Sequence, residues 1–374
     1  MREGDELRML RETAASFAAN ELLRDREETD RHPFVPLPAH TLEKAHRLGF
    51  FSLTVPEALG GGGQGTGALA ALLTVIGETD ASLGGIIFVN ALAQEICLRS
   101  GAGEALAGLI EAESAAQALL AFPAWDDPRF APPSLRAVER EGGWSLDGRA
   151  EYVALAGLAL RALLPADSGR DGISFYMVDR GSGKLGLSDP LVSHGLRACP
   201  CRDLVLKQAP GTLVGEEGAG ARAFEEAYGR MLPGGAALSA GILRGSLREA
   251  LEYVKQRRQG GRVIAEWSEV RMILAGMAMA SQEADMLVRE ACRAVEEGYP
   301  GWRLAVRAAS LRAMDLACEA TTDGIQLLGG NGYMVEYHQE KRFRDSRQVQ
   351  ALMGAQDLKR QELARLLLEE GLPG

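Results

Sequence analysis

The chain has 374 residues, of which 46% are apolar and 25% charged, as is typical of globular proteins with a large core. Its net charge of −10 argues against a nucleic-acid-binding surface, and no apolar segment approaches the roughly 18 residues of a membrane span. The start, MREGDELRML, does not resemble a signal peptide, and the few scattered cysteines favour a reduced, cytoplasmic protein. The five histidines show no paired spacing, so we expect no metal site.

Apolar residues at helical spacing predict an N-terminal helical domain over residues 1–116. The glycine run Gly60–Gly63 lacks the Lys-Ser/Thr pair of a phosphate-binding P-loop, and we interpret it as a turn. The predicted helices are residues 6–23, 41–48, 68–78, 83–99 and 103–112.

Short apolar runs separated by Gly, Asp and Pro predict a middle β-domain over residues 117–222, built as a small barrel or sandwich. We attribute Cys199 and Cys201 to strand packing, since their spacing is not that of a redox pair. The predicted strands are residues 118–122, 144–146, 150–154, 158–164, 174–178 and 204–206.

Long helices return in residues 223–374, which we expect to form a C-terminal four-helix domain. The helix over 305–328 ends at Gly329-Gly330-Asn331-Gly332, and a charged loop is expected over 336–345. Methionines on the helix over 267–297 are expected to fill the core: Met272, Met277, Met279 and Met286. The predicted helices are residues 245–258, 267–297, 305–328 and 357–370.

The segment QLLGGNGY, followed by Glu336-Tyr337, Glu340-Lys341 and Arg344-Asp345, closely resembles the C-terminal signature of the acyl-CoA dehydrogenase family. The resemblance extends over nearly the whole chain, including Gly215-Glu216-Glu217-Gly218 at the end of the β-region. It implies an α+β, mostly α fold: an N-terminal helical domain, a middle β-barrel or sandwich, and a C-terminal four-helix bundle.

Members of this family bind FAD and oxidise acyl-CoA thioesters to 2,3-enoyl-CoA, and a glutamate removes the α-proton as hydride leaves to the flavin. Aligned with the family's Tyr-Glu-Gly-Thr motif, this chain has Met353 at the glutamate position, and a thioether binds no proton near pH 7. Some relatives carry the glutamate one residue before an arginine that resembles Arg230, and here that residue is Gly229. The resemblance therefore implies a substrate-binding role for Arg230 and no catalytic residue. Three nearby carboxylates fit a solvated helix face equally well, so none is assigned as base: Glu225, Glu226 and Asp357.

Residues that hold the flavin ring within one subunit of the family have changed here. The Thr-Glu-Pro motif resembles Ala121-Phe122-Pro123, and the Gly-Ser-Asp that follows resembles Asp126-Asp127-Pro128. A Trp-Ile-Thr strand resembles Tyr152-Val153-Ala154, and the threonine of the glutamate motif is Ala355. Each lost hydroxyl contact costs about 0.5–1.5 kcal/mol, which weakens binding of FAD within this chain.

The residues through which a neighbouring subunit of the family reaches the ADP portion of FAD are retained. They resemble Arg257, Gln326, Gly329 and Gly330, although a phenylalanine three residues after the arginine is Gly260 here. An arginine fork suits a pyrophosphate, and glycines let the backbone approach closely. The alternative interpretation is a charge at a helix end and a simple helix cap.

The first hypothesis is a subunit of a mixed tetramer that contacts FAD held by a paralogous subunit bearing the glutamate. Its partners would be an acyl-CoA substrate and electron-transfer flavoprotein or a similar acceptor. The alternatives are a single-component flavoenzyme of the family with a relocated base or altered chemistry, and a non-catalytic CoA-thioester-binding protein.

Overall fold

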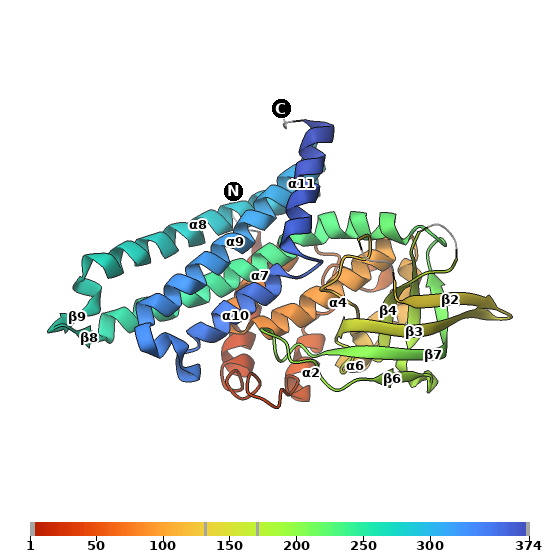
Figure 1. Ribbon diagram of the computed structural model, residues 1–374, viewed down its shortest axis with the longest axis horizontal. Coiled ribbons are helices and arrows are strands. Elements are labelled where there is room, and N and C mark those ends of the chain that lie inside the picture. The colour runs from red at the N-terminus through yellow and green to blue at the C-terminus, as the bar shows by residue number, and fades with distance from the viewer. Residues whose placement is uncertain (1–3, 131–132, 170–171, 372–374) are drawn as a thin grey trace.

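The computed structural model describes residues 4–130, 133–169 and 172–371. Long helices run side by side at one end of the molecule, and a β-sheet occupies the other end (Figure 1). The expected α+β, mostly α fold is confirmed, whereas the predicted domain boundaries at 116/117 and 222/223 stay predictions.

The N-terminal region is helical because its apolar residues recur at helical spacing and bury one another. The helix α1 continues into a π-helical turn, Ala18–Leu22, and the predicted helix over 103–112 is a 3-10 turn followed by the short α5. The helices are α1 Asp5–Phe17, α2 Ala39–Arg47, α3 Thr66–Thr79, α4 Ala81–Arg99, α5 Ala107–Ile110 and α6 Ala115–Ala118.

The helix α4 runs through the protein core and is capped by Asp80, whose carboxylate accepts a hydrogen bond from the Ser82 backbone N–H at 2.7 Å. By length and composition α4 could cross a membrane, but 94% of its most apolar 18-residue window is buried inside the protein. It is therefore a core helix, which packs against α7 on one side and against β1 on another.

One mixed sheet forms the β-region, in the order β1-β4-β5-β7-β3-β2, with β6 paired to β7. The edge strand β2 returns to the end of β4, where the Ala137 N–H donates to Asp167 O at 2.8 Å, so the sheet curls toward a barrel. The strands are β1 Leu120–Ala121, β2 Leu135–Arg140, β3 Gly143–Ala154, β4 Arg161–Ala166, β5 Ser174–Asp179, β6 Leu185–Leu187 and β7 Cys201–Val214.

Two strand predictions are corrected. Residues 144–146 and 150–154 belong to the single strand β3, whose register on β7 shifts twice by irregular pairing. The strand β2 was not predicted, since most of its exposed residues are charged and only Leu135 and Ala137 are buried.

The C-terminal helices are longer and more numerous than predicted. Sequence reasoning begins a helix at Gly245, whereas α7 continues through Pro233 and several glycines. These glycines are packed: a Cβ on Gly241 would lie 2.3 Å from the Thr74 carbonyl oxygen of α3. The elements are α7 Gly220–Gln256, β8 Arg258–Gln259, β9 Arg262–Val263, α8 Ser268–Glu297, α9 Trp302–Leu328, α10 Gln339–Gln350 and α11 Gln356–Glu370.

Two further expectations about this region are wrong. The charged loop expected over 336–345 lies largely in α10, where many of the charged side chains are buried. On α8 only Met277 fills the core, whereas Met272, Met279 and Met286 are 74%, 72% and 57% exposed. The methionines were misassigned because a seven-residue spacing describes an outer helix face as well as an inner one.

Candidate functional site

A cavity of about 590 Å³ lies where α7, α8 and α9 meet the β8–β9 turn, at the end of the molecule away from the sheet (Figure 1). It brings together the residues that the sequence singled out for cofactor contact, Arg257, Gln326, Gly329 and Gly330. Its other lining residues are Tyr253, Gln259, Gly260, Ile264, Trp267, Val270, Leu327, Leu328 and Asn331.

The cavity is shaped by how two helices end. Helix α7 stops at Gln256, and Arg257 takes an extended conformation while its N–H still donates to Tyr253 O at 2.9 Å. Helix α9 stops at Gly329, whose φ of 57° suits glycine. No described atom lies within 4 Å of a Cβ built on Gly329 or Gly330, so the backbone there is accessible.

Sequence reasoning missed the aromatic part of this cavity. The indole of Trp267 lies over Gly260, where a Cβ would be 2.9 Å from the ring atom Cζ2. The Arg262 guanidinium stacks on the same indole, 3.7 Å from the ring centroid. The Trp267 ring leaves no room for a larger side chain at position 260. The combination of Gly260 and Trp267 was therefore the sequence signal from which this aromatic surface could have been predicted.

The lining chemistry fits the ADP portion of a dinucleotide. The Arg257 guanidinium can bind paired phosphate oxygens, and the Gln326 amide can both donate and accept hydrogen bonds. Open glycine backbone and an aromatic surface complete a site for a phosphate-bearing, partly aromatic ligand.

Two of the predicted positions for the flavin ring, Ala121 and Ala154, lie in solid core. Ala121 and Ala154 are 1% and 0% exposed, and Phe122 and Ala154 exchange backbone hydrogen bonds of 3.1 and 2.9 Å. The cavity beside Ala121 is only about 10 Å³, room for one water at most. Met353 is 0% exposed, has φ of 60°, and its N–H donates to Ala124 O at 2.6 Å. The segment joining α10 to α11 is therefore packed directly on the segment after β1, and these residues do not fit a flavin ring.

Other predicted ring positions, in contrast, are open: a cavity of about 190 Å³ borders Pro123, Asp126 and Pro128. Tyr152 lies on the surface with 54% exposure, and its backbone N–H donates to the Asp203 carboxylate at 3.0 Å. Ala355 is exposed at the start of α11.

A group of buried charges, the Arg129 cluster, closes the space between the β-region and the C-terminal helices. Its members are Asp127, Arg129, Glu225, Arg307 and Glu362. The Arg129 side chain pairs with three carboxylates, at 2.9 Å to Asp127 Oδ1, at 2.7 Å to Glu362 Oε1, and with Glu225. Arg307, fully buried, pairs with Glu225 at 2.5 Å.

The Arg129 guanidinium also lies against two aromatic rings of α7, 5.4 Å from the Phe224 centroid and 5.0 Å from that of Tyr228. Removal of one member of the cluster would leave the other charges buried and unpaired, and this would strongly destabilise the fold.

Lys359 fixes the segment that carries Met353. Its Nζ donates to Gln350 O at 3.0 Å and to Leu352 O. Burial lowers the pKa of the Lys359 amine to about 7, against a smaller opposing effect of Asp127.

The predicted substrate and base positions lie elsewhere on α7. Gly229 is buried, and a Cβ there would lie 3.2 Å from the Trp302 ring. Arg230 pairs with the buried Glu95, with Nε 3.0 Å from Oε1, and burial raises the pKa of Glu95. Of the carboxylates left open by the sequence, Glu225 lies in the Arg129 cluster and Asp357 is exposed.

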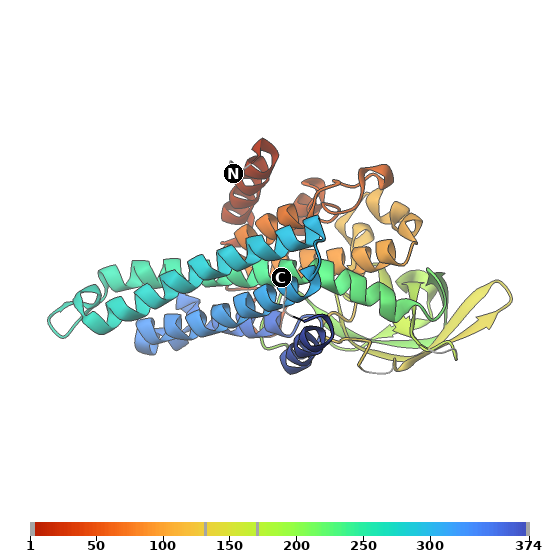
Figure 2. The ribbon, with the colours of Figure 1, turned by 90° about the horizontal axis from the view of Figure 1, so that it is seen from above.

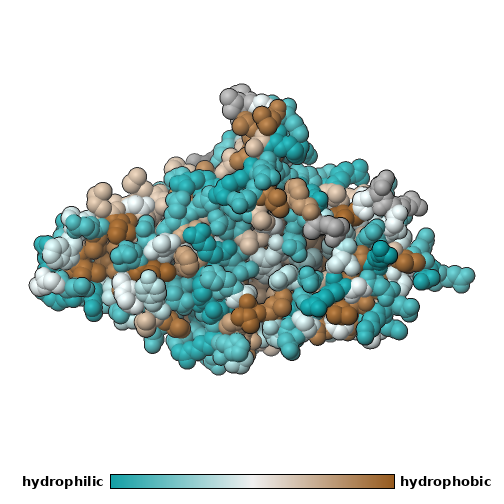
Figure 3. Space-filling view, in the orientation of Figure 1, coloured by the Kyte–Doolittle hydropathy of each residue, from teal (hydrophilic) through white to brown (hydrophobic). Residues whose placement is uncertain are grey.

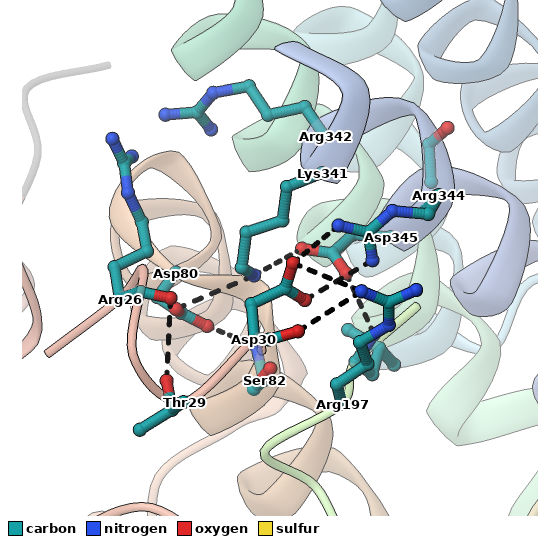
Figure 4. Close-up of polar contacts among 12 residues, drawn as sticks. Arg26, Thr29, Asp30, Asp80, Ser82, Arg197, Lys341, Arg342, Arg344 and Asp345 are labelled. Carbon is teal, nitrogen blue, oxygen red and sulfur yellow. Dashed lines mark hydrogen bonds and ion pairs between the residues drawn. The ribbon is translucent and has the colours of Figure 1, made fainter. Parts of the chain in front are cut away.

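The charged signature of α10 has a structural role. Lys341 Nζ lies 2.7 Å from Asp345 and 3.5 Å from Asp80, while Arg344 pairs with Asp30 (Figure 4). The Asp345 carboxylate also accepts from the Leu196 N–H at 2.7 Å. These contacts join α10 to the N-terminal segment, to the cap of α4 and to the loop before β7.

The cavity and the Arg129 cluster lie toward opposite ends of α7. Glu225 of the cluster is near the start of α7 and Arg257 is just after its end, 32 residues later, which corresponds to about 48 Å along a helix at 1.5 Å per residue.

Sequence comparison identifies both helical regions. The N-terminal domain of acyl-CoA dehydrogenases matches residues 4–106, and the C-terminal domain of the same family matches residues 218–368. The chain belongs to the acyl-CoA dehydrogenase family. Its relatives within the acyl-CoA dehydrogenases include a probable acyl-CoA dehydrogenase, FadE25, of Mycobacterium tuberculosis, 27% identical over 369 residues that cover 96% of this chain and 94% of the relative.

Two further relatives are similar over the full length. The cyclohex-1-ene-1-carbonyl-CoA dehydrogenase of Syntrophus aciditrophicus is 27% identical, covering 97% of this chain and 90% of the relative. The caffeyl-CoA reductase-Etf complex subunit CarC of Acetobacterium woodii is 27% identical, with 97% and 98% covered.

Solved structures agree on the acyl-CoA dehydrogenase fold. A structure reported with the electron transferring flavoprotein of Acidaminococcus fermentans superposes with a TM-score of 0.88 at 25% identity, covering 98% of this chain and 99% of the other. Butyryl-CoA dehydrogenase of Megasphaera elsdenii also gives 0.88, at 23% identity and with the same coverage.

Proposed function

We propose that this chain is the base-less subunit of a heteromeric acyl-CoA dehydrogenase, and that its cavity receives the ADP portion of an FAD held by a paralogous subunit. The observation that carries the proposal is the contrast within one chain between an open ADP-type cavity, lined by Arg257 and Gln326, and family ring and base positions that are packed into the core. The ring of the same FAD would then belong to another subunit.

The absence of an acidic side chain at both family positions for the base supports this division of labour. Met353 is buried and hydrogen-bonded through its backbone, and Gly229 is backed by Trp302. A weakly acidic α-proton requires a positioned base, which the partner subunit would supply as its glutamate.

The proposal includes the other members of the assembly. The substrate is an acyl-CoA thioester desaturated at the partner, the complex is a mixed tetramer, and its location is the cytoplasm. A relative named as a subunit of a caffeyl-CoA reductase-Etf complex supports electron-transfer flavoprotein as the electron acceptor.

The decisive experiment measures flavin content after expression alone and with a glutamate-bearing paralogue. We expect the isolated chain to be colourless, and the co-expressed proteins to form a stable mixed tetramer with one flavin per heterodimer. Arg257→Ala should weaken FAD binding in that tetramer about 10- to 150-fold, because a charge-assisted contact contributes about 1.5–3 kcal/mol. Arg258→Ala is the matched control, since Arg258 neighbours the cavity without lining it.

The alternatives give different results in the same experiment. A yellow homo-oligomer would identify a single-component flavoenzyme with a relocated base. A chain that carries no flavin in any assembly but is thermally stabilised by CoA thioesters would be a non-catalytic binder. Indifference of the mixed complex to Arg257→Ala would defeat the proposal.

A further inference from the structure

A second, small and largely enclosed cavity lies between the segment before α2, residues 34–36, and the segment that leads into β7, residues 190–202. Its volume is about 60 Å³, which is room for roughly four waters and too little for an organic cofactor. It shares no lining residue with the cavity at the end of α7. In the view from above, α1 and α11 lie on opposite long sides of the molecule (Figure 2), and the segment that covers this small cavity follows α1 in the chain.

Two arginines line the small cavity, and each has a buried Nε. Among the residues that the structure describes, no hydrogen-bond acceptor pairs with the Nε of Arg197 or of Arg202. Gly157 leaves space beside one of them, because a Cβ at this position would lie 3.2 Å from Arg202 Nε. A buried N–H without an acceptor costs free energy, so both groups favour an acceptor inside the cavity.

The positive charge of Arg202 has no counter-charge in the described part of the chain. Its Nη1 donates to the Ser188 carbonyl oxygen at 2.8 Å, and no described carboxylate lies within 4.0 Å of its guanidinium. Arg197 Nη1 lies 3.4 Å from Asp30 Oδ2, but Arg344 also pairs with that carboxylate (Figure 4). The cavity therefore has a surplus of positive charge, and a buried charge is normally paired.

The remaining walls of the cavity are neutral. No described residue that lines it is an aspartate or a glutamate. Burial raises the pKa of the Cys199 and Cys201 thiols, that of Cys199 to about 12, so both stay uncharged at neutral pH. The Arg197 guanidinium lies 4.7 Å from the centroid of the Phe34 ring. The loop before β7 is apolar on its outer side, where Val192 is 72% exposed and a brown patch lies at the lower centre of Figure 3.

We propose that this cavity binds a small inorganic anion of about chloride size, which accepts hydrogen bonds from the Nε groups of Arg197 and Arg202. A water molecule would satisfy the two N–H groups but would leave the charge of Arg202 unpaired. The anion joins the segment before α2 to the residues that enter β7, and it thereby stabilises the contact between the N-terminal helices and the β-region. This role does not depend on flavin or on a partner subunit.

Thermal unfolding of the full-length chain tests the proposal. Sodium chloride is raised while sodium gluconate keeps the ionic strength constant, because gluconate is too large for a cavity of this size. We expect a saturable rise in the melting temperature, about 2–4 °C at ten times the dissociation constant. A chain whose melting temperature does not depend on the exchange of gluconate for chloride would overturn the proposal.

Two variants separate anion binding from general stability. Gly157→Ala keeps both arginines but fills the space beside Arg202 Nε, and Arg202→Gln removes the unpaired charge. Each should weaken the apparent chloride affinity at least about tenfold, whatever its own melting temperature. Arg136→Gln, on the exposed side of β2, removes the same charge outside the cavity and should retain the full chloride effect. A chloride effect that survives in both cavity variants would overturn the proposal.

Bromide locates the anion directly. Crystals of the full-length chain soaked in sodium bromide should give an anomalous-scattering peak in the cavity beside Arg197 and Arg202, and Gly157→Ala crystals should lose it. Peaks confined to the outer surface would indicate an adventitious ion only and would overturn the proposal.

Discussion

Arg129, on the loop after β1, forms a buried ion pair with Glu362 on α11, with Nη1 2.7 Å from Oε1. The contact joins residues 233 positions apart and ties the β-region to the last helix of the chain. Together with Glu225 and Arg307, this ion pair fills the junction between the β-region and the C-terminal helices with charged side chains. In the same chain, the family ring positions at Ala121 and Ala154 are part of the folded core.

Arg129→Ala should lower the free energy of unfolding by about 3–5 kcal/mol, because it leaves buried carboxylates without their counter-charge. Urea denaturation followed by circular dichroism measures the loss. The matched control is Arg365→Ala, whose pair with Glu369 is about half exposed and should cost less than about 1 kcal/mol. Equal losses for the two variants would show that the Arg129 cluster does not stabilise the fold.

Met353→Glu should not create an efficient dehydrogenase. The new carboxylate would enter a fully buried site beside the Ala124 carbonyl, and Ala121 and Ala154 would still offer no hydroxyl to a flavin ring. Steady-state assays with an acyl-CoA, an electron acceptor and saturating FAD test this. Turnover at ordinary enzyme rates, about 1–10³ s⁻¹, would contradict our account of the closed site.

Adding threonine at positions 121, 154 and 355 in the Met353→Glu background is the companion experiment. If flavin affinity depends on those hydroxyls, it should rise before any activity appears. Flavin affinity is measured by equilibrium dialysis, separately from turnover. Activity that appears without a gain in affinity would point to a different flavin site.

Gly330→Leu should lower FAD content in the mixed complex while leaving the stability of the isolated chain within about 0.5 kcal/mol of wild type. The reason is that no described atom lies within 4 Å of a Cβ at this position, so the side chain would extend into open cavity space. Flavin absorbance of the complex and thermal unfolding of the chain measure the two effects. A large loss of stability would mean that Gly330 is needed as a helix cap and not as an opening.

Glu249→Gln should change how stability depends on pH. Burial alone would raise the pKa of the Glu249 carboxyl, but the adjacent Arg342 and Arg26 guanidinium groups bring it to about 2, below its ordinary 4.5. A lowered folded-state pKa contributes stability above pH 4.5, about 3 kcal/mol at most, and loses it as the pH falls toward 2.

The difference in unfolding free energy between wild type and Glu249→Gln should therefore be full above pH 4.5 and shrink toward pH 2. Urea denaturation over pH 2–7 measures it, with Glu252→Gln on the exposed side of α7 as the control. A difference independent of pH would show that Glu249 acts through packing and not through its charge.

The sequence by itself determined the helix–sheet–helix order and the family. Apolar residues located α3, α4, α8 and α9 within a few residues, because α8 buries one face and α3 and α4 are apolar on almost every side. It also singled out Arg257, Gln326 and the two glycines, since motif residues keep their order even where their three-dimensional neighbourhood is unknown.

Only the tertiary structure decided which residues meet. Three features depend on contacts that local sequence does not specify: Trp267 covers Gly260, Arg129 reaches Glu362, and α10 is buried. The methionines of α8 make the same point, because helical spacing fixes a face but not the side on which the rest of the protein lies. Sequence records local preference, whereas burial and charge pairing are set by the neighbours that folding brings together.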